Sequence, residues 1–260
     1  MERSLRNVLV NSTLAFVSAF IITTILHELG HFISYIVFGK SPALFHNYVQ
    51  NLDQVLTIQA KVISALAGPF VSLIQGLGFA LVVSKRRGNS PTDLFFLWLA
   101  LLGFVNFFGY LVMTPLSITG DTGKVAHLLN IDYSIRIIIA IVGFGSLVWI
   151  IRKIGRNFSN FIPSQHDLQW RKSYLYRLMP LPILIGSVAN TLLAFPVVAL
   201  VNIIYPATSS YVIMVAFNVV LGSFNSQITK PQLEDTIIKG LVLLTAFSIF
   251  LNRLLALGAT

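Results

Sequence analysis

The chain contains no cysteine, and only 10% of its 260 residues are charged. The absence of cysteine excludes disulfide bonds, thiolate metal ligands and a cysteine nucleophile. The scarcity of charge excludes a water-soluble globular domain, because such domains carry roughly 25% charged residues. No loop between the apolar runs is long enough for a folded domain of even about 50 residues. Any selection of a substrate is therefore expected from the apolar part of the chain or from a separate substrate-presenting or regulatory partner.

Long apolar runs dominate the sequence instead. Apolar residues make up 55% of the chain, and a helix of about 20 such residues crosses a hydrocarbon core of about 30 Å. The sequence therefore predicts an all-α, polytopic integral membrane protein with six transmembrane helices, or seven if one shorter run also crosses the lipid bilayer. The six runs lie near 10–38, 58–83, 93–113, 134–152, 182–205 and 236–257, and the shorter run lies at 211–224.

The net charge of +9 comes from basic residues that gather in alternate loops. Such a distribution is typical of loops on the cytoplasmic side, so it predicts a cytoplasmic N-terminus in a cell or organelle membrane. Basic residues beside lipid headgroups explain the charge, and no nucleic-acid partner is expected. The mixture of basic and aromatic residues at 153–180 predicts a segment at the membrane interface. The basic residues are Arg3 and Arg6, then Lys85, Arg86 and Arg87, then Arg152, Lys153, Arg156, Arg171, Lys172 and Arg177.

The sequence LHELGH at 26–31 places ionisable residues inside the first apolar run. A charge at the centre of a bilayer costs about 2.5–3.5 kcal/mol on insertion scales, so residues of this kind usually have a function there. On a helix His27 and His31 share one face and can bind one zinc ion. Glu28 flanks that face and can take a proton from a zinc-bound water. The alternative is a structural pair of histidines that bond to other helices.

A hydrolytic zinc ion usually has three protein ligands and one open position. Asp121 follows the third apolar run, and runs one and three point in the same direction, so it reaches the side of the two histidines. His127 and Glu234 are further candidates for the third ligand. His46 and His166 lie in loops and are expected to be ordinary surface histidines.

Here the sequence resembles the site-2 protease family of intramembrane zinc metalloproteases, over about the first half of the chain. The HELGH motif is the first matching piece. The second is SALAGPFVSLIQGLG, in which Gly68 and Pro69 match a Gly-Pro-x-x-Asn signature and Ser72 stands where asparagine is usual. The third is TPLSITGDTGK at 114–124, similar to a Pro…Leu-Asp-Gly-Gly-Arg segment, and it implies Asp121 as the third zinc ligand.

The sequence also departs from the family pattern near Asp121. Thr122 replaces the first glycine after the aspartate, and the asparagine usual a few residues earlier is absent. That asparagine is associated with substrate binding, and Asn106 is the residue that could replace it. The resemblance thus implies Gly68, Pro69, Ser72 and Asn106 as the substrate-binding set.

Together these observations predict a zinc metalloendopeptidase that hydrolyses a peptide bond in or near a transmembrane segment of a membrane-protein substrate. A zinc-bound water activated by Glu28 would attack the peptide carbonyl. Residues 1–133 form the expected site-2-protease-like catalytic core, with a polar cavity among the first three spans. Residues 134–260 are expected to add transmembrane helices that mainly pack. The loop at 39–57 is either a plain connection or a strand edge on which an unwound substrate pairs.

Other functions remain open at this level. The protein could be a zinc-binding scaffold without proteolytic activity, for which the missing asparagine would be a sign. It could also be an ion- or proton-coupled transporter that uses the HELGH residues, although the chain lacks the internal repeat common in transporters. Asn190, Asn202 and Asn218 in the later runs are expected to bond between helices or to line a water path.

Overall fold

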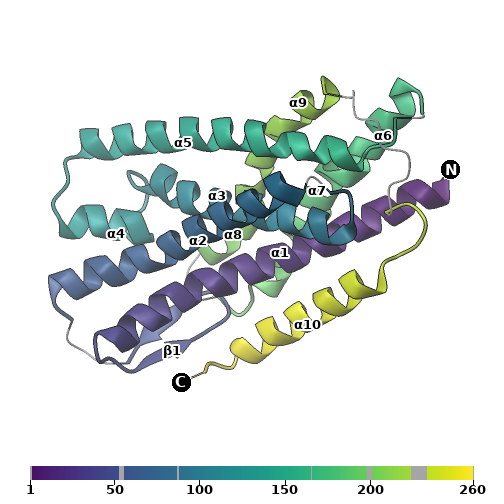
Figure 1. Cartoon of the computed structure of the whole chain (residues 1–260). Coiled ribbons are helices and arrows are strands. Elements are labelled where there is room, and N and C mark those ends of the chain that lie inside the picture. The colour runs from purple at the N-terminus through teal and green to yellow at the C-terminus, as the bar shows by residue number, and fades with distance from the viewer. Residues whose placement is uncertain are drawn as a thin grey trace.

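The computed structural model describes residues 2–52, 56–86, 88–164, 166–197, 201–223 and 233–259. Within these ranges the chain is helical apart from one antiparallel hairpin, which confirms the predicted all-α class (Figure 1). The helices are α1 (Glu2–Val37), α2 (Ile58–Arg86), α3 (Pro91–Met113), α4 (Asp121–Leu128), α5 (Tyr133–Gly155), the 3₁₀ helix η1 (Arg156–Phe161), α6 (Leu168–Leu178), α7 (Pro180–Leu193), α8 (Val201–Thr208), the 3₁₀ helix η2 (Ser209–Ala216), α9 (Phe217–Leu221) and α10 (Lys239–Leu255). The hairpin joins β1 (Pro42–Leu44) to β2 (Val49–Asn51).

In the described part of the chain, five helical segments are long and apolar enough to cross a membrane. They are α1, α2, α3, the continuous segment Tyr133–Phe161 and the segment Asn202–Leu221. The first four match predicted runs, and the fifth joins the short run at 211–224 to the residues before it. The chain is therefore a polytopic membrane protein.

The predicted run 182–205 is wrong as a single helix. Helix α7 ends at Leu193, and the next helix begins at Val201. Pro196 lies between them; it has no backbone N–H to continue the helical hydrogen bonds, and it restricts Phe195 before it. Parts of five predicted features, namely Arg87 and residues 53–55, 165, 198–200 and 224, lie outside the described residues.

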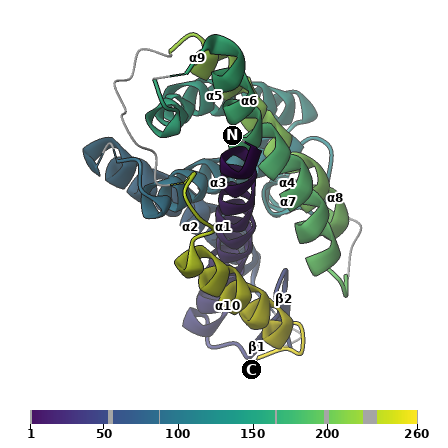
Figure 2. The same cartoon turned by 90° about the vertical axis from the view of Figure 1, so that its right-hand side faces the viewer.

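Helix α1 lies at the centre of the molecule (Figure 2). It packs against α2 and α3 on one side and against α7 and α10 on the other. Polar side chains fix these contacts, because a hydrogen bond is specific where both surfaces are apolar. Asn11 Nδ2 donates to the carbonyls of Leu233 at 3.0 Å and Thr236 at 2.9 Å, and Ser12 Oγ donates to the carbonyl of Leu178 at 2.7 Å. The C-terminal half is thus attached along α1.

The first three helices form an antiparallel series in which α1 and α3 run the same way. Gln75 on α2 connects all three, since its Nε2 donates to Thr23 Oγ1 at 2.7 Å and to the carbonyl of Leu99 at 2.9 Å. Gly30 lets α1 approach α2 closely, because a Cβ there would lie 2.7 Å from the carbonyl oxygen of Ala67. The contact between α1 and α2 at this level therefore depends on glycine.

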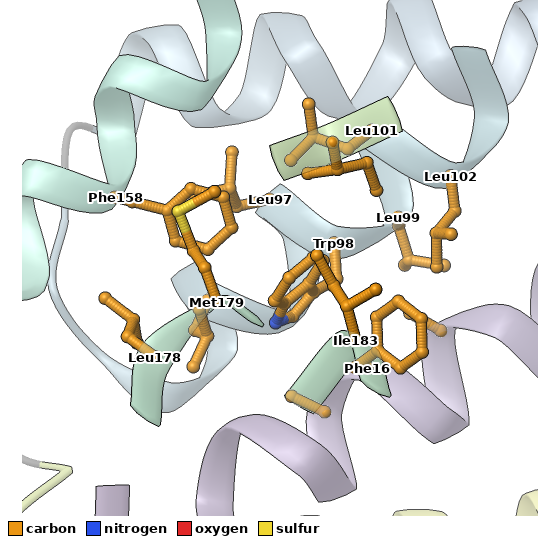
Figure 3. Packing of buried hydrophobic residues seen from close by; sticks show 14 of the residues in the cluster. Phe16, Leu97, Trp98, Leu99, Leu101, Leu102, Phe158, Leu178, Met179 and Ile183 are labelled. Carbon is orange, nitrogen blue, oxygen red and sulfur yellow. The ribbon is translucent and has the colours of Figure 1, made fainter. Parts of the chain in front are cut away.

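The aromatic core lies toward the N-terminal end of α1 (Figure 3). Trp98 is fully buried, with ring centroids 5.0 Å from Phe16 and 4.9 Å from Phe158. Tyr174 is also fully buried. The aromatic residues of the segment 153–180 therefore mostly pack inward, while its basic residues remain at the surface of this end.

Candidate metal centre

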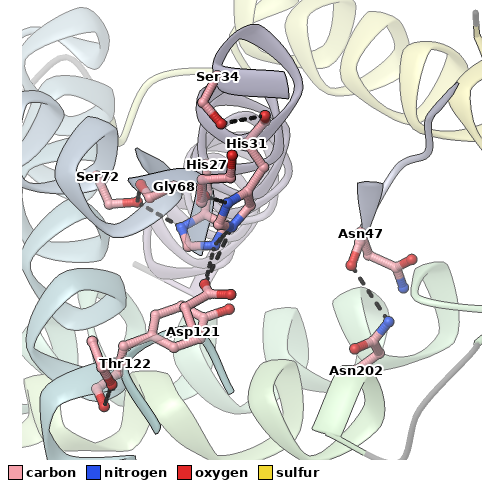
Figure 4. A network of polar contacts seen from close by, with 11 residues as sticks. His27, His31, Ser34, Asn47, Gly68, Ser72, Asp121, Thr122 and Asn202 are labelled. Atoms are coloured by element: carbon pink, nitrogen blue, oxygen red, sulfur yellow. Dashed lines mark hydrogen bonds and ion pairs between the residues drawn. The ribbon is translucent and has the colours of Figure 1, made fainter. Parts of the chain in front are cut away.

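Two helices and one connecting turn bring His27, His31 and Asp121 together. The Nε2 atoms of the two histidines, one turn apart on α1, lie 3.1 Å from each other. Asp121 Oδ2 lies 3.1 Å from His27 Nε2 and 3.2 Å from His31 Nε2. Figure 4 shows both imidazoles pointing at this carboxylate. The three predicted metal ligands thus meet at one point.

The outer nitrogen of each imidazole has a hydrogen-bond partner that fixes its proton. His31 Nδ1 donates to the carbonyl of Ser64 at 2.6 Å, a partner that can only accept. His27 Nδ1 lies 3.2 Å from Ser72 Oγ, and that hydroxyl donates to the carbonyl of Gly68, so the imidazole donates to it. In the neutral imidazole with its proton on Nδ1, each Nε2 atom carries a lone pair, as in histidines that bind metals.

The geometry of the three inner atoms fits a metal ion. The two Nε2 atoms and a carboxylate oxygen lie within 3.2 Å of one another, an arrangement that a shared cation between them would stabilise. Tetrahedral ligands at 2.0–2.1 Å from zinc are about 3.3–3.4 Å apart. In the described ranges this trio is the one group of three His, Asp or Glu side chains with such an arrangement.

Comparison with protein-family models, curated proteins and solved structures gives no match.

Gly68 leaves the space that the inner atoms need. A Cβ on this residue would lie 2.7 Å from His27 Nε2 and closer still to His31 Nε2. Ser72, one turn later on α2, contacts His27, and Pro69 is buried beside Gly68. Gly68 and Ser72 thus support the histidines directly; their role in substrate binding remains a prediction.

The turn between α3 and α4 places Asp121. Asp121 is the first residue of α4. Thr122 Oγ1 donates to the carbonyl of Tyr110 at 2.5 Å and accepts from Thr114 Oγ1 at 2.8 Å, which joins the start of α4 to the end of α3. Gly123 packs so tightly that a Cβ there would collide with the carbonyl of Ser117. Thr122, which stands where the family pattern has glycine, therefore holds the start of α4 against the end of α3.

Tyr110 completes the surroundings of the metal ligands. Its ring stacks on His27, with centroids 4.9 Å apart and planes at 6°. Tyr110 also lines the cavity beside these ligands. Asp121 presents its carboxylate to both imidazoles. The charged form is the one that binds a metal.

A cavity of about 280 Å³ adjoins the candidate metal centre. His27 and Glu28 line it from α1, and Asn106 and Tyr110 line it from α3. Glu28 is buried and directly follows the first ligand, His27, in the chain. The predicted location among the first three spans is only partly right. Among the described residues α2 contributes none to the lining, whereas α7 and α8 do.

Two alternative metal ligands lie elsewhere. Glu234 accepts a hydrogen bond from Ser4 Oγ at 2.8 Å. Ser4 and His27 are on the same helix with a rise of 1.5 Å per residue, so they are separated by about 34 Å. His127 is exposed on α4. The candidate centre therefore contains neither residue.

The two loop histidines differ from each other. His166 is exposed and stacks on Trp170, as expected of a surface residue. The same prediction is wrong for His46, which is 1% exposed and whose Nε2 donates to the carbonyl of Ala194 at 2.9 Å. The hairpin packs against the end of α7, a contact that local sequence does not reveal.

The sequence reasoning missed Tyr110 and Ser64. Ser64 acts through its backbone carbonyl, which no sequence pattern marks. Tyr110 had a signal, because Asn106 and Tyr110 are four residues apart in an apolar helix and so share one face. Two polar side chains on one face of a membrane helix indicate a cavity or a partner.

Proposed function

We propose that the chain is an intramembrane zinc metalloprotease that resembles the site-2 protease family and hydrolyses a peptide bond in or near a transmembrane segment of a membrane protein. The observation that carries this proposal is the convergence of His27, His31 and Asp121 beside the buried carboxylate of Glu28. The three sequence segments that resemble the family meet at this one place. Two imidazoles and one carboxylate form a donor set suited to zinc, with a position left for water or substrate.

Each residue of the centre has a role in the proposed reaction. A zinc ion held by His27, His31 and Asp121 would polarise a peptide carbonyl and make water more acidic. Ser72 and the carbonyl of Ser64 hold the imidazoles in the binding tautomer. Glu28 takes a proton from the attacking water and passes it to the leaving amine.

The hairpin offers a place for an unwound substrate. A transmembrane helix uses its backbone groups internally, so a substrate must lose helical structure before it is cleaved. Leu44 in β1 pairs with Val49 and also exchanges hydrogen bonds with Ala259, at 2.7 and 2.9 Å. An extended substrate would therefore pair with the outer edge of β2.

The test combines metal analysis with a cleavage assay on protein reconstituted in lipid nanodiscs. We expect about one zinc per chain in the wild type and in Glu28→Gln, with cleavage of single-span substrates in the wild type alone. Cleavage by Glu28→Gln at the wild-type rate would contradict the proposed role of Glu28. Zinc without cleavage in the wild type would favour a zinc-binding scaffold instead.

A further inference from the structure

The C-terminal half contributes an unusual side chain to the cavity. Asn190 on α7 is 4% exposed and lines the cavity. Neither its Nδ2 nor its Oδ1 has a hydrogen-bond partner within the described part of the chain. An amide buried in this way is costly unless something bonds to it. It is therefore a candidate for contact with a ligand.

The packing of α7 on α1 gives the position of Asn190 relative to Glu28. The carbonyl of Leu178, at the end of α6 just before α7, accepts from Ser12, and a Cβ on Gly186 in α7 would collide with the ring of Phe16, so the chain from Leu178 along α7 follows the direction of α1. Asn190 lies one turn beyond Gly186 and so is level with the turn after Phe16. From that turn to Glu28 there are about two turns of helix, or about 11 Å.

A second unpartnered amide lies at the same level. Asn106 on α3 is 2% exposed, lines the cavity and has an Oδ1 without a described partner. Tyr205 lines the same cavity as Asn106, and its ring lies 5.6 Å from that of Phe20. The two amides thus face one section of the cavity from opposite halves of the chain.

The chemistry of this section suits a neutral ligand with both donors and acceptors. Among the described residues that line the cavity, Glu28 is the one acidic side chain, at the end beside the histidines, and none is lysine, arginine or aspartate. An asparagine side chain offers one acceptor and two N–H donors, which match the N–H and C=O of a peptide unit. A peptide unit in an intact transmembrane helix has already used both groups, so an unwound segment is the ligand that needs them.

We propose that Asn190 and Asn106 form a peptide-binding subsite that holds an unwound peptide unit of the substrate. The offset of about 11 Å between Asn190 and Glu28, measured along the axis of α1, corresponds to about three extended residues at 3.3 Å each. The bound unit is therefore about three residues from the bond that is cleaved. This inference rests on the proposed function, and it assigns a role in substrate selection to residues 134–260.

The experiment measures binding in a Glu28→Gln background, where the probe is not consumed. The probes are two fluorescent single-span peptides, one with an Asn-Gly break in the middle of the span and one with an uninterrupted polyleucine span. We expect Asn190→Leu, which has the same number and branching of side-chain heavy atoms, to weaken binding of the broken peptide about tenfold and to leave the unbroken one unchanged. Asn218→Leu is the matched control, because Asn218 is exposed and lies away from the cavity lining.

A second measurement replaces single backbone amides of the broken peptide with esters. We expect an ester at one position to weaken binding to the Asn190 form and to have no effect on the Asn190→Leu form. Equal binding of the broken peptide to both forms, or no sensitive ester position in the Asn190 form, would overturn the subsite. Binding that depends on Asn190, combined with no cleavage by the wild type, would refute the protease function and leave the subsite in place.

Discussion

Replacing Gly68 by alanine should remove the metal while leaving the fold intact. The added methyl group would lie 2.7 Å from His27 Nε2, whereas ordinary van der Waals contact begins at 3.4 Å. His27 is held between Ser72 and the ring of Tyr110, so it has little freedom to move away. The required displacement of at least about 0.7 Å is more than three times the tolerance of about 0.2 Å on metal–ligand distances.

The expected result is a fall in bound zinc from about one per chain to less than about a tenth, with a parallel loss of cleavage. Alanine is favoured over glycine inside a helix by about 1 kcal/mol, so α2 itself should not be weakened. Zinc is measured by elemental analysis and the fold by circular dichroism. Gly78→Ala is the matched control on the same helix, because a Cβ there meets nothing within 4 Å. Full zinc occupancy in Gly68→Ala would refute the placement of the ion between the two histidines.

Three further predictions concern the ligands and the hairpin. Asp121→Ala should lose zinc and Glu234→Ala should keep it, and equal zinc content in the two purified variants would exclude Asp121 as a ligand. Tyr110→Ala removes the ring that stacks on His27, so competition with a chelator should show a 10- to 100-fold lower zinc affinity, whereas an unchanged affinity would mean that the ring does not orient the ligand. Burial lowers the pKa of His46 below its usual value of about 6.5, against the hydrogen bond to Ala194 and with a smaller contribution from a nearby arginine. The stability that neutral His46 provides is therefore complete above about pH 6.5 and is lost as the pH falls below it. The melting temperatures at pH 7.5 and pH 5.5 should differ less in His46→Gln than in the wild type. The same shift of the melting temperature in both proteins would contradict this prediction.

The helices of the fold could be predicted where the length of an apolar run alone decides the structure. The runs at 58–83 and 93–113 match α2 and α3 closely, because an apolar run of this length is helical in a membrane and because Ser90 and Asp93 form a capping box at the start of α3. The run at 182–205 failed because mean hydropathy does not detect one proline. The prediction that the first and third runs point in the same direction is also met by α1 and α3, since successive membrane spans alternate in direction.

The candidate site could be predicted only as far as its ionisable residues. The spacing of His27 and His31 indicates a shared face, and the span directions bring Asp121 to the same side. The contact between Gly68 and the imidazoles depends on the register of α1 against α2, which no local pattern contains. The unpartnered amide of Asn190 depends on how α7 packs far along the chain, and sequence alone offered either a helix contact or a water path for it.

Two of the proposed ligands come from one helix and the third from a turn that lies 90 positions later in the chain than His31. An ion bound there would act as a cross-link that closes a long loop of the folded chain. Its binding free energy would be added to the stability of the whole bundle, by about 4 kcal/mol when free metal exceeds its dissociation constant a thousandfold. Resistance to unfolding would then report the metal supply of the compartment in which the chain is assembled.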